Sequence, residues 1–272
     1  MINFNPKVIF EAKNLSYNYP GKLPALNQVS FTVETGELVA LIGANGSGKS
    51  TLLKIMNGLL LPSDGELRVY GQSLSEKILK DNKLLSEFRR KVGLVFQDPD
   101  VQLFSPTVWE EVTFGPLQLG IPKEEVISRG QSALELLCIS HLRERPPYLL
   151  SGGEKKKVSL ASVLSVDPQV ILMDEPTAGL DPRSQGLLID FLLQWGNQEK
   201  CLIFSTQDLD LVEEVATRVI IMSADHTIIA DGTPDQYLFD PAFLLRSNLV
   251  HEHSHRHKEL IHRHRHLHKH EH

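Results

Sequence analysis

The fold of this chain is decided by the stretch Gly43-Ala44-Asn45-Gly46-Ser47-Gly48-Lys49-Ser50-Thr51. It matches the pattern G-x-x-x-x-G-K-[ST], in which glycines let the backbone curl around a phosphate group. An apolar run over residues 38–42 precedes the stretch and predicts a buried parallel strand. The stretch is followed by apolar residues at helical spacing, namely Leu52, Leu53, Ile55 and Met56. Because the pattern requires a strand before it and a helix after it, we predict a phosphate-binding loop over residues 43–51.

Each residue type in this loop has a task in binding a nucleotide. Successive backbone N–H groups turn inward as an anion nest, and the positive end of the following helix adds to it. Lys49 supplies a point charge for the β- and γ-phosphates, and the Ser50 hydroxyl is placed to hold Mg²⁺. The alternative, a glycine-rich turn that matches by chance, is disfavoured by the flanking strand and helix.

Two later strands end in polar residues that suit the same chemistry. The apolar run 170–173 predicts a buried strand, and it is followed by Asp174 and Glu175. Asp174 can hold Mg²⁺ through its water shell, and Glu175 can polarise a water toward the γ-phosphate. Residues 92–96 form another predicted buried strand, and Gln97 after it can reach a metal ion or a water. The alternative for Gln97 is an ordinary turn residue.

A second glycine motif opens a predicted helix at residue 151. Ser151 and Glu154 have the spacing of a capping box, which is by itself a structural reason for both residues. The functional interpretation adds that Ser151, Gly152 and Gly153 form a second anion site at the helix start. The lysines that follow, residues 155–157, are interpreted as a solvated helix face rather than a phosphate clamp.

Composition and charge limit the class of protein. The chain has 272 residues, 41% hydrophobic and 23% charged, and no apolar run reaches the ~20 residues that span a bilayer. The net charge is −6, and residues 1–250 carry −8 because the tail, residues 251–272, carries +2. An acidic body argues against nucleic acid as a partner. Cys138 and Cys201 match no metal-ligand spacing, so we expect buried free thiols in a reducing, cytoplasmic setting.

The order of the predicted elements indicates an α/β core with additions. Residues 8–40 are predicted to form strands separated by turns, and Tyr19 lies near the end of one of them. Tyr19 is a candidate to stack on a purine ring; the alternative is an aromatic residue that packs at a strand end. A helical subdomain, about 101–165, is predicted as an insertion in a domain that spans residues 1–250.

The tail, residues 251–272, contains ten of the twelve histidines in the chain. It lacks the apolar residues that build a core, so we expect disorder. Histidine at this density binds borderline divalent metals such as nickel, cobalt or zinc. The competing interpretations are an engineered tag and a merely solubilising tail. The candidate ligands are His251, His253, His255, His257, His262, His264, His266, His268, His270 and His272.

Taken together, these stretches resemble the nucleotide-binding subunit of an ABC transporter over about residues 7–245. The resemblance rests on the phosphate loop, Gln97, the Leu150–Glu154 signature, the Asp174-Glu175 strand end and the Gly179-Leu180-Asp181 turn. The segment Phe96–Phe104 is similar to the energy-coupling-factor type, especially its cobalt- and nickel-uptake ATPases. The resemblance implies an α/β fold: a P-loop NTPase (RecA-like) core with an N-terminal antiparallel β subdomain and an inserted α-helical subdomain.

The resemblance also implies roles for individual residues. Tyr19 would stack on adenine, residues 43–51 would hold the phosphates of ATP, and Ser50, Gln97 and Asp174 would serve Mg²⁺. Two subunits would close head to tail, so that Ser151, Gly152 and Gly153 of one reach the γ-phosphate bound by the other. Integral membrane subunits would receive this motion at the cytoplasmic face of the membrane, where the chain would be peripheral.

Four functional hypotheses follow from the sequence. The first is an ATPase that powers uptake of a divalent metal ion, as a homodimer under membrane subunits. The second is the ATPase of a vitamin importer, paired with a second, different ATPase. The third is a soluble ABC-type ATPase not tied to transport, which the acidic body and the lack of a second ATPase module disfavour. The fourth, a metal-storage protein with a vestigial ATPase, is disfavoured by the intact Lys49, Asp174 and Glu175.

Two residues depart from the family pattern. The signature usually ends in glutamine, and Glu154 there is a mild change because glutamate also caps a helix start. After the predicted strand 201–205 the family usually places a histidine, and here the residue is Gln207. Glu175 and Gln207 are therefore the candidate catalytic residues, the second of them altered.

We predict that Gln207 slows hydrolysis while nucleotide binding is kept. Glutamine can donate a hydrogen bond to a γ-phosphate, but it cannot carry a proton or a positive charge. Gln207→His is expected to raise the turnover number of ATP hydrolysis in a steady-state assay. An unchanged or lower turnover number would contradict the prediction.

Overall fold

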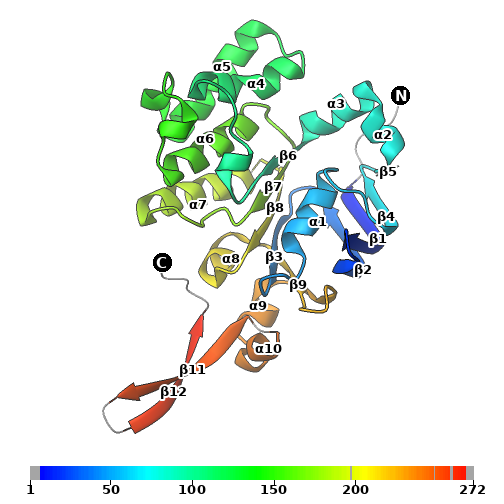
Figure 1. Ribbon diagram of the computed structural model, residues 1–272, viewed down its shortest axis with the longest axis vertical. Coiled ribbons are helices and arrows are strands. Elements are labelled where there is room, and N and C mark those ends of the chain that lie inside the picture. The colour runs from blue at the N-terminus through cyan, green and yellow to red at the C-terminus, as the bar shows by residue number, and fades with distance from the viewer. Residues whose placement is uncertain (1–6, 197, 248, 258–259, 268–272) are drawn as a thin grey trace. The chain divides into compact units, whose positions relative to one another are not determined.

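The computed structural model describes residues 7–196, 198–247, 249–257 and 260–267 (Figure 1). Contacts between Cα atoms divide the chain into two compact units. Unit 1 combines Met1–Ser73 with Phe204–His272, and unit 2 is Leu74–Ile203. The two ends of the chain therefore belong to one unit, and the middle of the chain forms the other.

The first sheet of unit 1 is antiparallel. It contains β1 (Val8–Tyr19), β2 (Leu23–Glu34), β4 (Asp64–Val69) and β5 (Gln72–Ser73), in the order β2-β1-β4-β5. From Gln28 to Val33 burial alternates along β2, because the side chains that face the core are apolar and those between them are exposed. The antiparallel sheet that the resemblance implied is thus present in the first 73 residues.

Parallel pairing in unit 1 positions the phosphate loop. β3 (Leu38–Gly43) is buried along its whole length and runs parallel to β9 (Arg218–Met222). β10 (Ile228–Gly232) pairs antiparallel with β9 and closes this part of the chain as a hairpin. α1 (Lys49–Met56) follows the loop and buries its apolar side chains. The remaining helices of unit 1 are α8 (Leu209–Val215), α9 (Pro234–Tyr237) and α10 (Pro241–Arg246).

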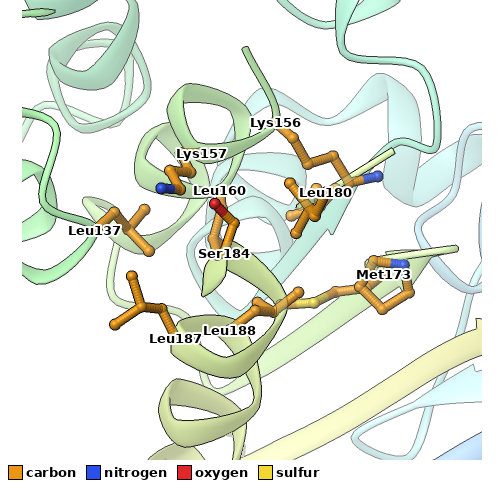
Figure 2. Close-up of a pocket in the computed structure, with 11 residues that line it drawn as sticks. Leu137, Lys156, Lys157, Leu160, Met173, Leu180, Ser184, Leu187 and Leu188 are labelled. Atoms are coloured by element: carbon orange, nitrogen blue, oxygen red, sulfur yellow. The ribbon is translucent and has the colours of Figure 1, made fainter. Parts of the chain in front are cut away.

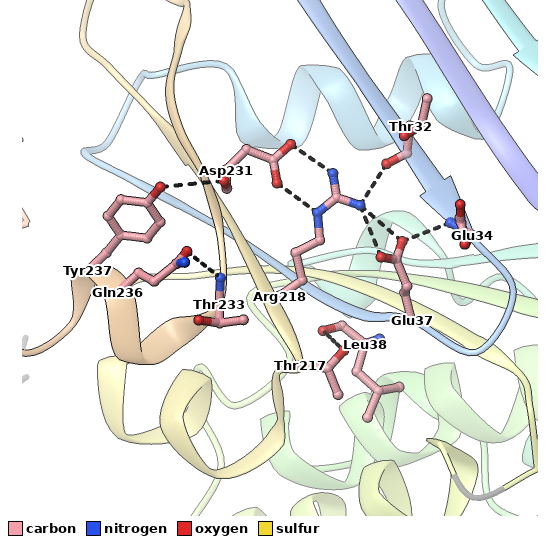
Figure 3. A network of polar contacts seen from close by, with 10 residues as sticks. All are labelled: Thr32, Glu34, Glu37, Leu38, Thr217, Arg218, Asp231, Thr233, Gln236 and Tyr237. Atoms are coloured by element: carbon pink, nitrogen blue, oxygen red, sulfur yellow. Dashed lines mark hydrogen bonds and ion pairs between the residues drawn. The ribbon is translucent and has the colours of Figure 1, made fainter.

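Arg218 ties three strand ends of unit 1 together (Figure 3). Its guanidinium donates to both carboxylate oxygens of Asp231 at 2.7 Å, to both of Glu37 at 3.1 Å, and to the carbonyl of Thr32 at 2.9 Å. The hydrogen bonds to Asp231, and then the charges of Asp231 and Glu37, raise the pKa of Arg218 against the effect of burial. This network fixes the start of β9 beside β2 and β10.

Unit 2 has a parallel pair of strands and a helical region. β6 (Val92–Val95) runs parallel to β7 (Val170–Asp174), and β8 (Cys201–Thr206) takes the chain back toward unit 1. α2 (Glu76–Lys80) and α3 (Asn82–Lys91) precede β6. Four further segments, η1 (Pro99–Val101), α4 (Val108–Gln118), α5 (Lys123–Leu136) and α6 (Gly152–Leu164), lie between β6 and β7, with the short turns η2 (Ser140–Leu142) and η3 (Pro147–Leu149) before α6.

Packing holds the inserted helices together within unit 2. α4 packs against α5 and α6, and the Ser165 hydroxyl donates to the Val112 carbonyl at 2.7 Å. Trp109 of α4 lies under the Arg143 guanidinium, 3.8 Å from the ring centroid. α7 (Pro182–Gly196) follows β7 and buries Phe191 and Trp195.

One expectation from the sequence is corrected by the structure. Cys201 is buried, but Cys138 is exposed, because it lies just beyond the end of α5 in a left-handed turn with φ of 57°. In the described part of the tail, the backbone of β11 (Val250–His257) pairs antiparallel with that of β12 (Leu260–Leu267). Residues 258–259 and 268–272 lie outside the described residues.

Within the described part of the chain, none of the helices combines the length and the apolar character needed to cross a bilayer.

Candidate functional site

The phosphate loop of unit 1 has a backbone that requires glycine at two positions. Gly48 has φ of 106°, and a Cβ atom there would lie 2.1 Å from the Ala25 carbonyl oxygen. Gly43 has φ of 155°, and a Cβ atom there would lie 2.5 Å from the Met222 carbonyl oxygen. These neighbours are backbone atoms, which cannot move aside as the end of a flexible side chain can. The strands β2 and β9 therefore confine the loop to its curled shape. The prediction of a loop between a buried strand and a helix is confirmed.

Lys49 curls back over the loop that precedes it. Its ammonium donates to the carbonyls of Gly43 at 2.7 Å and Ala44 at 3.2 Å, although the residue is only 6% exposed. Ser47 is buried, and its hydroxyl has no hydrogen-bond partner among the described residues. The helix start beside it has no side-chain cap, because the capping position is Gly48. A buried hydroxyl at such a position can donate to an oxygen of a phosphate group.

Two predicted residues lie against the loop within unit 1. The Tyr19 hydroxyl is 3.2 Å from the Thr51 hydroxyl, and its ring meets that of Tyr17 edge to face at 5.0 Å. The Gln207 amide donates to the side-chain oxygen of Asn45. The fold therefore brings the residue after β8 onto the loop, although 162 positions separate it from Asn45.

The acidic pair of unit 2 ends a buried strand. Asp174 is the last residue of β7 and is 8% exposed. Glu175 has φ of 47°, in the left-handed region that non-glycine residues seldom occupy. Strain of this kind is concentrated at functional sites, where the surrounding structure holds it in place.

The signature motif of unit 2 forms the predicted capping box. Glu154 accepts from the backbone N–H and the hydroxyl of Ser151, both at 2.8 Å, and Ser151 accepts from the Glu154 N–H at 3.4 Å. These hydrogen bonds, led by the one from the backbone, lower the pKa of Glu154. Gly152 has open space around its Cβ position, and Gly153 has only an ordinary contact with Leu180 at 3.8 Å. The helix start is therefore capped, with its glycines accessible.

Gln97 is exposed on a loop that α6 holds in place. Gln102 accepts from the Phe96 N–H at 3.2 Å and donates to the Ser159 carbonyl at 2.8 Å. Lys155 adds an ion pair to Asp100 at 2.7 Å. The loop after β6 is thus attached to the signature helix by side chains that the sequence analysis did not select.

Lys156 is the residue of this site that the sequence analysis missed. We expected residues 155–157 to form a solvated face, but Lys156 is 6% exposed and lines an apolar pocket between α6 and α7 (Figure 2). Burial, partly offset by the charges of Asp174, Glu175 and Asp98, lowers its pKa to about 8. The sequence contained a signal for its burial. Lys156 has the spacing of one helix face with Leu160 and Val163, which are both apolar.

The two units thus hold different parts of the predicted constellation. Unit 1 brings together Tyr19, the phosphate loop and Gln207, whereas unit 2 brings together Gln97, the signature motif and the acidic pair. Among the described residues, no group of three or more His, Cys, Asp or Glu side chains is placed to hold a metal ion. Of the tail histidines, His268, His270 and His272 lie outside the residues that the structure describes.

This loop, its neighbouring polar residues and the parallel strands define a P-loop protein that binds nucleoside triphosphates. The model of the family described as ABC transporter matches residues 26–178, more than half of the chain, so the chain belongs to the ABC transporter ATP-binding family. The fold class, the family and the ATP-hydrolysing activity predicted from the sequence are confirmed.

Relatives of known name share most of the chain's length. The nickel import ATP-binding protein NikO of Rhodobacter capsulatus is 45% identical over 244 residues, 89% of this chain and 95% of its own. The energy-coupling factor transporter ATP-binding protein EcfA of Methanocaldococcus jannaschii is 43% identical over 89% of this chain and 85% of its own. The solved structure of cbiO1 from Clostridium perfringens, part of the complex cbiONQ, has a TM-score of 0.74 at 34% identity, and it covers 89% of this chain and 94% of its own.

The glycines of the phosphate loop provide a matched pair of variants. Gly48→Ala places a methyl group against the Ala25 backbone. We therefore expect the free energy of unfolding to fall by about 3 kcal/mol or more, and ATP binding to be lost. Gly46 also has a left-handed φ, of 80°, but has nothing within 4 Å of its Cβ position. Gly46→Ala is therefore expected to cost only about 1 kcal/mol. Urea unfolding and titration with a fluorescent ATP analogue measure both effects, and equal losses in the two variants would contradict this account.

Proposed function

We propose that this chain is the ATPase subunit of an energy-coupling-factor importer whose cargo is a divalent transition-metal ion, cobalt or nickel. The observation that carries the proposal is the near full-length similarity to a nickel import ATPase and to cbiO1. The similarity to EcfA supports the transporter type but not the metal. For this reason the alternative is a vitamin importer with a second, different ATPase, in which Gln207 occupies one of two unequal sites.

The proposed roles follow the contacts within each unit. The loop of unit 1 holds the phosphates, with Lys49 as counter-charge and Tyr19 against adenine. Ser50, Gln97 and Asp174 serve Mg²⁺, which when bound neutralises charge on the phosphate oxygens. Oxygen donors of this kind are what Mg²⁺ prefers, so the residues present fit the ion. Glu175 polarises the attacking water, and Gln207, held by Asn45, donates to the γ-phosphate.

An exposed aromatic pair on unit 2 supports docking to a membrane subunit. Phe104 and Phe114 are 67% and 41% exposed, and their rings meet edge to face at 4.9 Å. Glu111 fixes the Phe104 backbone by accepting its N–H at 2.9 Å. ABC ATPases work as dimers with membrane subunits, and an aromatic pair held open to solvent after the Gln97 loop suits such a partner. The chain would then lie at the cytoplasmic face of the membrane.

Purification of the complex from native membranes without a tag tests this function. We expect two copies of this chain with integral membrane subunits, ATP hydrolysis by the complex, and a loss of about 100-fold in turnover with Glu175→Gln. A second, different ATPase in the complex would favour the vitamin importer. The absence of any membrane partner would overturn the proposal and favour an ATPase that is not tied to transport.

We also propose that the histidine tail binds a transition-metal ion. In the backbone register of β11 and β12, three pairs of histidines stand opposite one another: His251 with His266, His253 with His264, and His255 with His262. Opposite positions on antiparallel strands are the closest cross-strand neighbours, so the backbone of the hairpin places these histidine positions in pairs. Imidazole suits nickel, cobalt and zinc alike, and ligand type alone does not select among them.

Matched triple variants test whether the register matters. Replacing His251, His253 and His255 with Asn removes one member of each pair, whereas replacing His268, His270 and His272 removes three histidines that lie outside the described residues. Calorimetric titration of the full chain with nickel chloride is expected to show a weakening of about tenfold or more only for the first variant. Equal weakening in both would show that histidine density, not register, governs binding; no nickel binding by the wild type would overturn the tail proposal.

A further inference from the structure

A buried lysine joins the two strand ends that carry the chemistry of unit 2. The Lys156 ammonium lies within hydrogen-bond distance of four backbone carbonyls. Two belong to the end of β6, namely Phe96 at 3.2 Å and Gln97 at 3.0 Å. The others belong to the end of β7, namely Asp174 at 3.5 Å and Glu175 at 3.1 Å. An ammonium has three N–H donors, so the four carbonyls share them and every donor has an acceptor.

The four carbonyls belong to the backbone of the residues whose side chains are proposed to act on ATP. β6 and β7 are parallel neighbours, with Val95 in register with Met173, so their ends lie side by side. The position of a side chain such as that of Gln97 or Glu175 depends on how firmly the backbone of the same residue is held. At Glu175 the backbone is left-handed and intrinsically unfavourable, and the hydrogen bond from Lys156 helps to hold it.

The same lysine connects both strand ends to the signature motif. α6 begins at Gly152, one turn before Lys156, and Ser151 caps that helix. The stem of Lys156 lines the apolar pocket beside Met173, so its ammonium reaches the carbonyls from a packed position (Figure 2). A displacement of the signature end of α6 is therefore transmitted to Gln97 and Glu175 through one cation.

We propose that Lys156 is a positioning residue for ATP hydrolysis, whose ammonium fixes the backbone at 96–97 and 174–175 and so aims Gln97 and Glu175. This inference rests on the proposed function, because it needs Glu175 to act on the attacking water. It goes beyond that function in giving a role to a residue outside the nucleotide-contacting set.

Three variants of the full chain separate positioning from folding. Lys156→Met removes every donor, Lys156→Gln keeps two N–H donors without charge, and Lys157→Met removes a neighbouring charge whose ammonium points away from that of Lys156 (Figure 2). We expect Lys156→Met to lower kcat by about 100-fold and Lys156→Gln by less, with the Kd of a fluorescent ATP analogue unchanged within about twofold. Lys157→Met is expected to change kcat by less than about twofold.

Each contrary result has a distinct meaning. A kcat of Lys156→Met close to that of the wild type would overturn the positioning role. The positioning role would also be overturned if kcat, ATP affinity and melting temperature fell in parallel in both Lys156 variants. Such a result would indicate a structural role alone. If Glu175→Gln abolishes turnover while Lys156→Met does not, only this inference fails. If Glu175→Gln keeps full turnover, the proposed function fails with it.

Discussion

The close approach of the phosphate loop to the backbone of β2 and β9 is the constraint on which unit 1 depends. Gly48 passes the Ala25 carbonyl, and Gly43 passes the Met222 carbonyl, at distances that exclude any side chain. The loop is therefore curled by neighbouring backbone and not by its own hydrogen bonds alone. Because β3 is buried throughout and paired with β9, this curl is anchored in the core of the unit. A phosphate group meets a site that is already shaped, and binding does not have to order it.

A buried lysine that donates to backbone carbonyls occurs in each unit. Lys49 bonds to the carbonyls of Gly43 and Ala44, and Lys156 bonds to those at the ends of β6 and β7. Carbonyls satisfy the protons of an ammonium but carry no full charge, so much of its electrostatic attraction for an anion is retained. In unit 1 this residual charge suits a triphosphate. In unit 2 it lies beside Asp174 and Glu175 and fixes their backbone.

The signature helix combines three tasks within two turns. Its start is capped by Ser151 and Glu154, its glycines are left accessible, and its buried face carries Lys156. Gln102 and Lys155 attach the loop after β6 to the same helix. ATPases of this family dimerise, and the proposed function has events at this helix start reach Gln97 and Glu175. The contacts of unit 2 supply a short physical route, which runs through backbone and one cation.

The sequence alone determined the family, the fold class and the local elements, because these depend on short patterns: a glycine loop between strand and helix, a capping box, and acidic residues after an apolar run. It also identified Gln207 as a departure. It could not show that Lys156 is buried, because three consecutive lysines are typical of a solvated face, and only the packing of α6 against β6 decides which one turns inward. The exposure of Cys138 was missed because an apolar sequence neighbourhood does not show where helix α5 ends and the chain turns outward. Only the tertiary structure decided which backbone carbonyls each buried cation meets, since those atoms belong to strands that are distant in sequence and alike in composition.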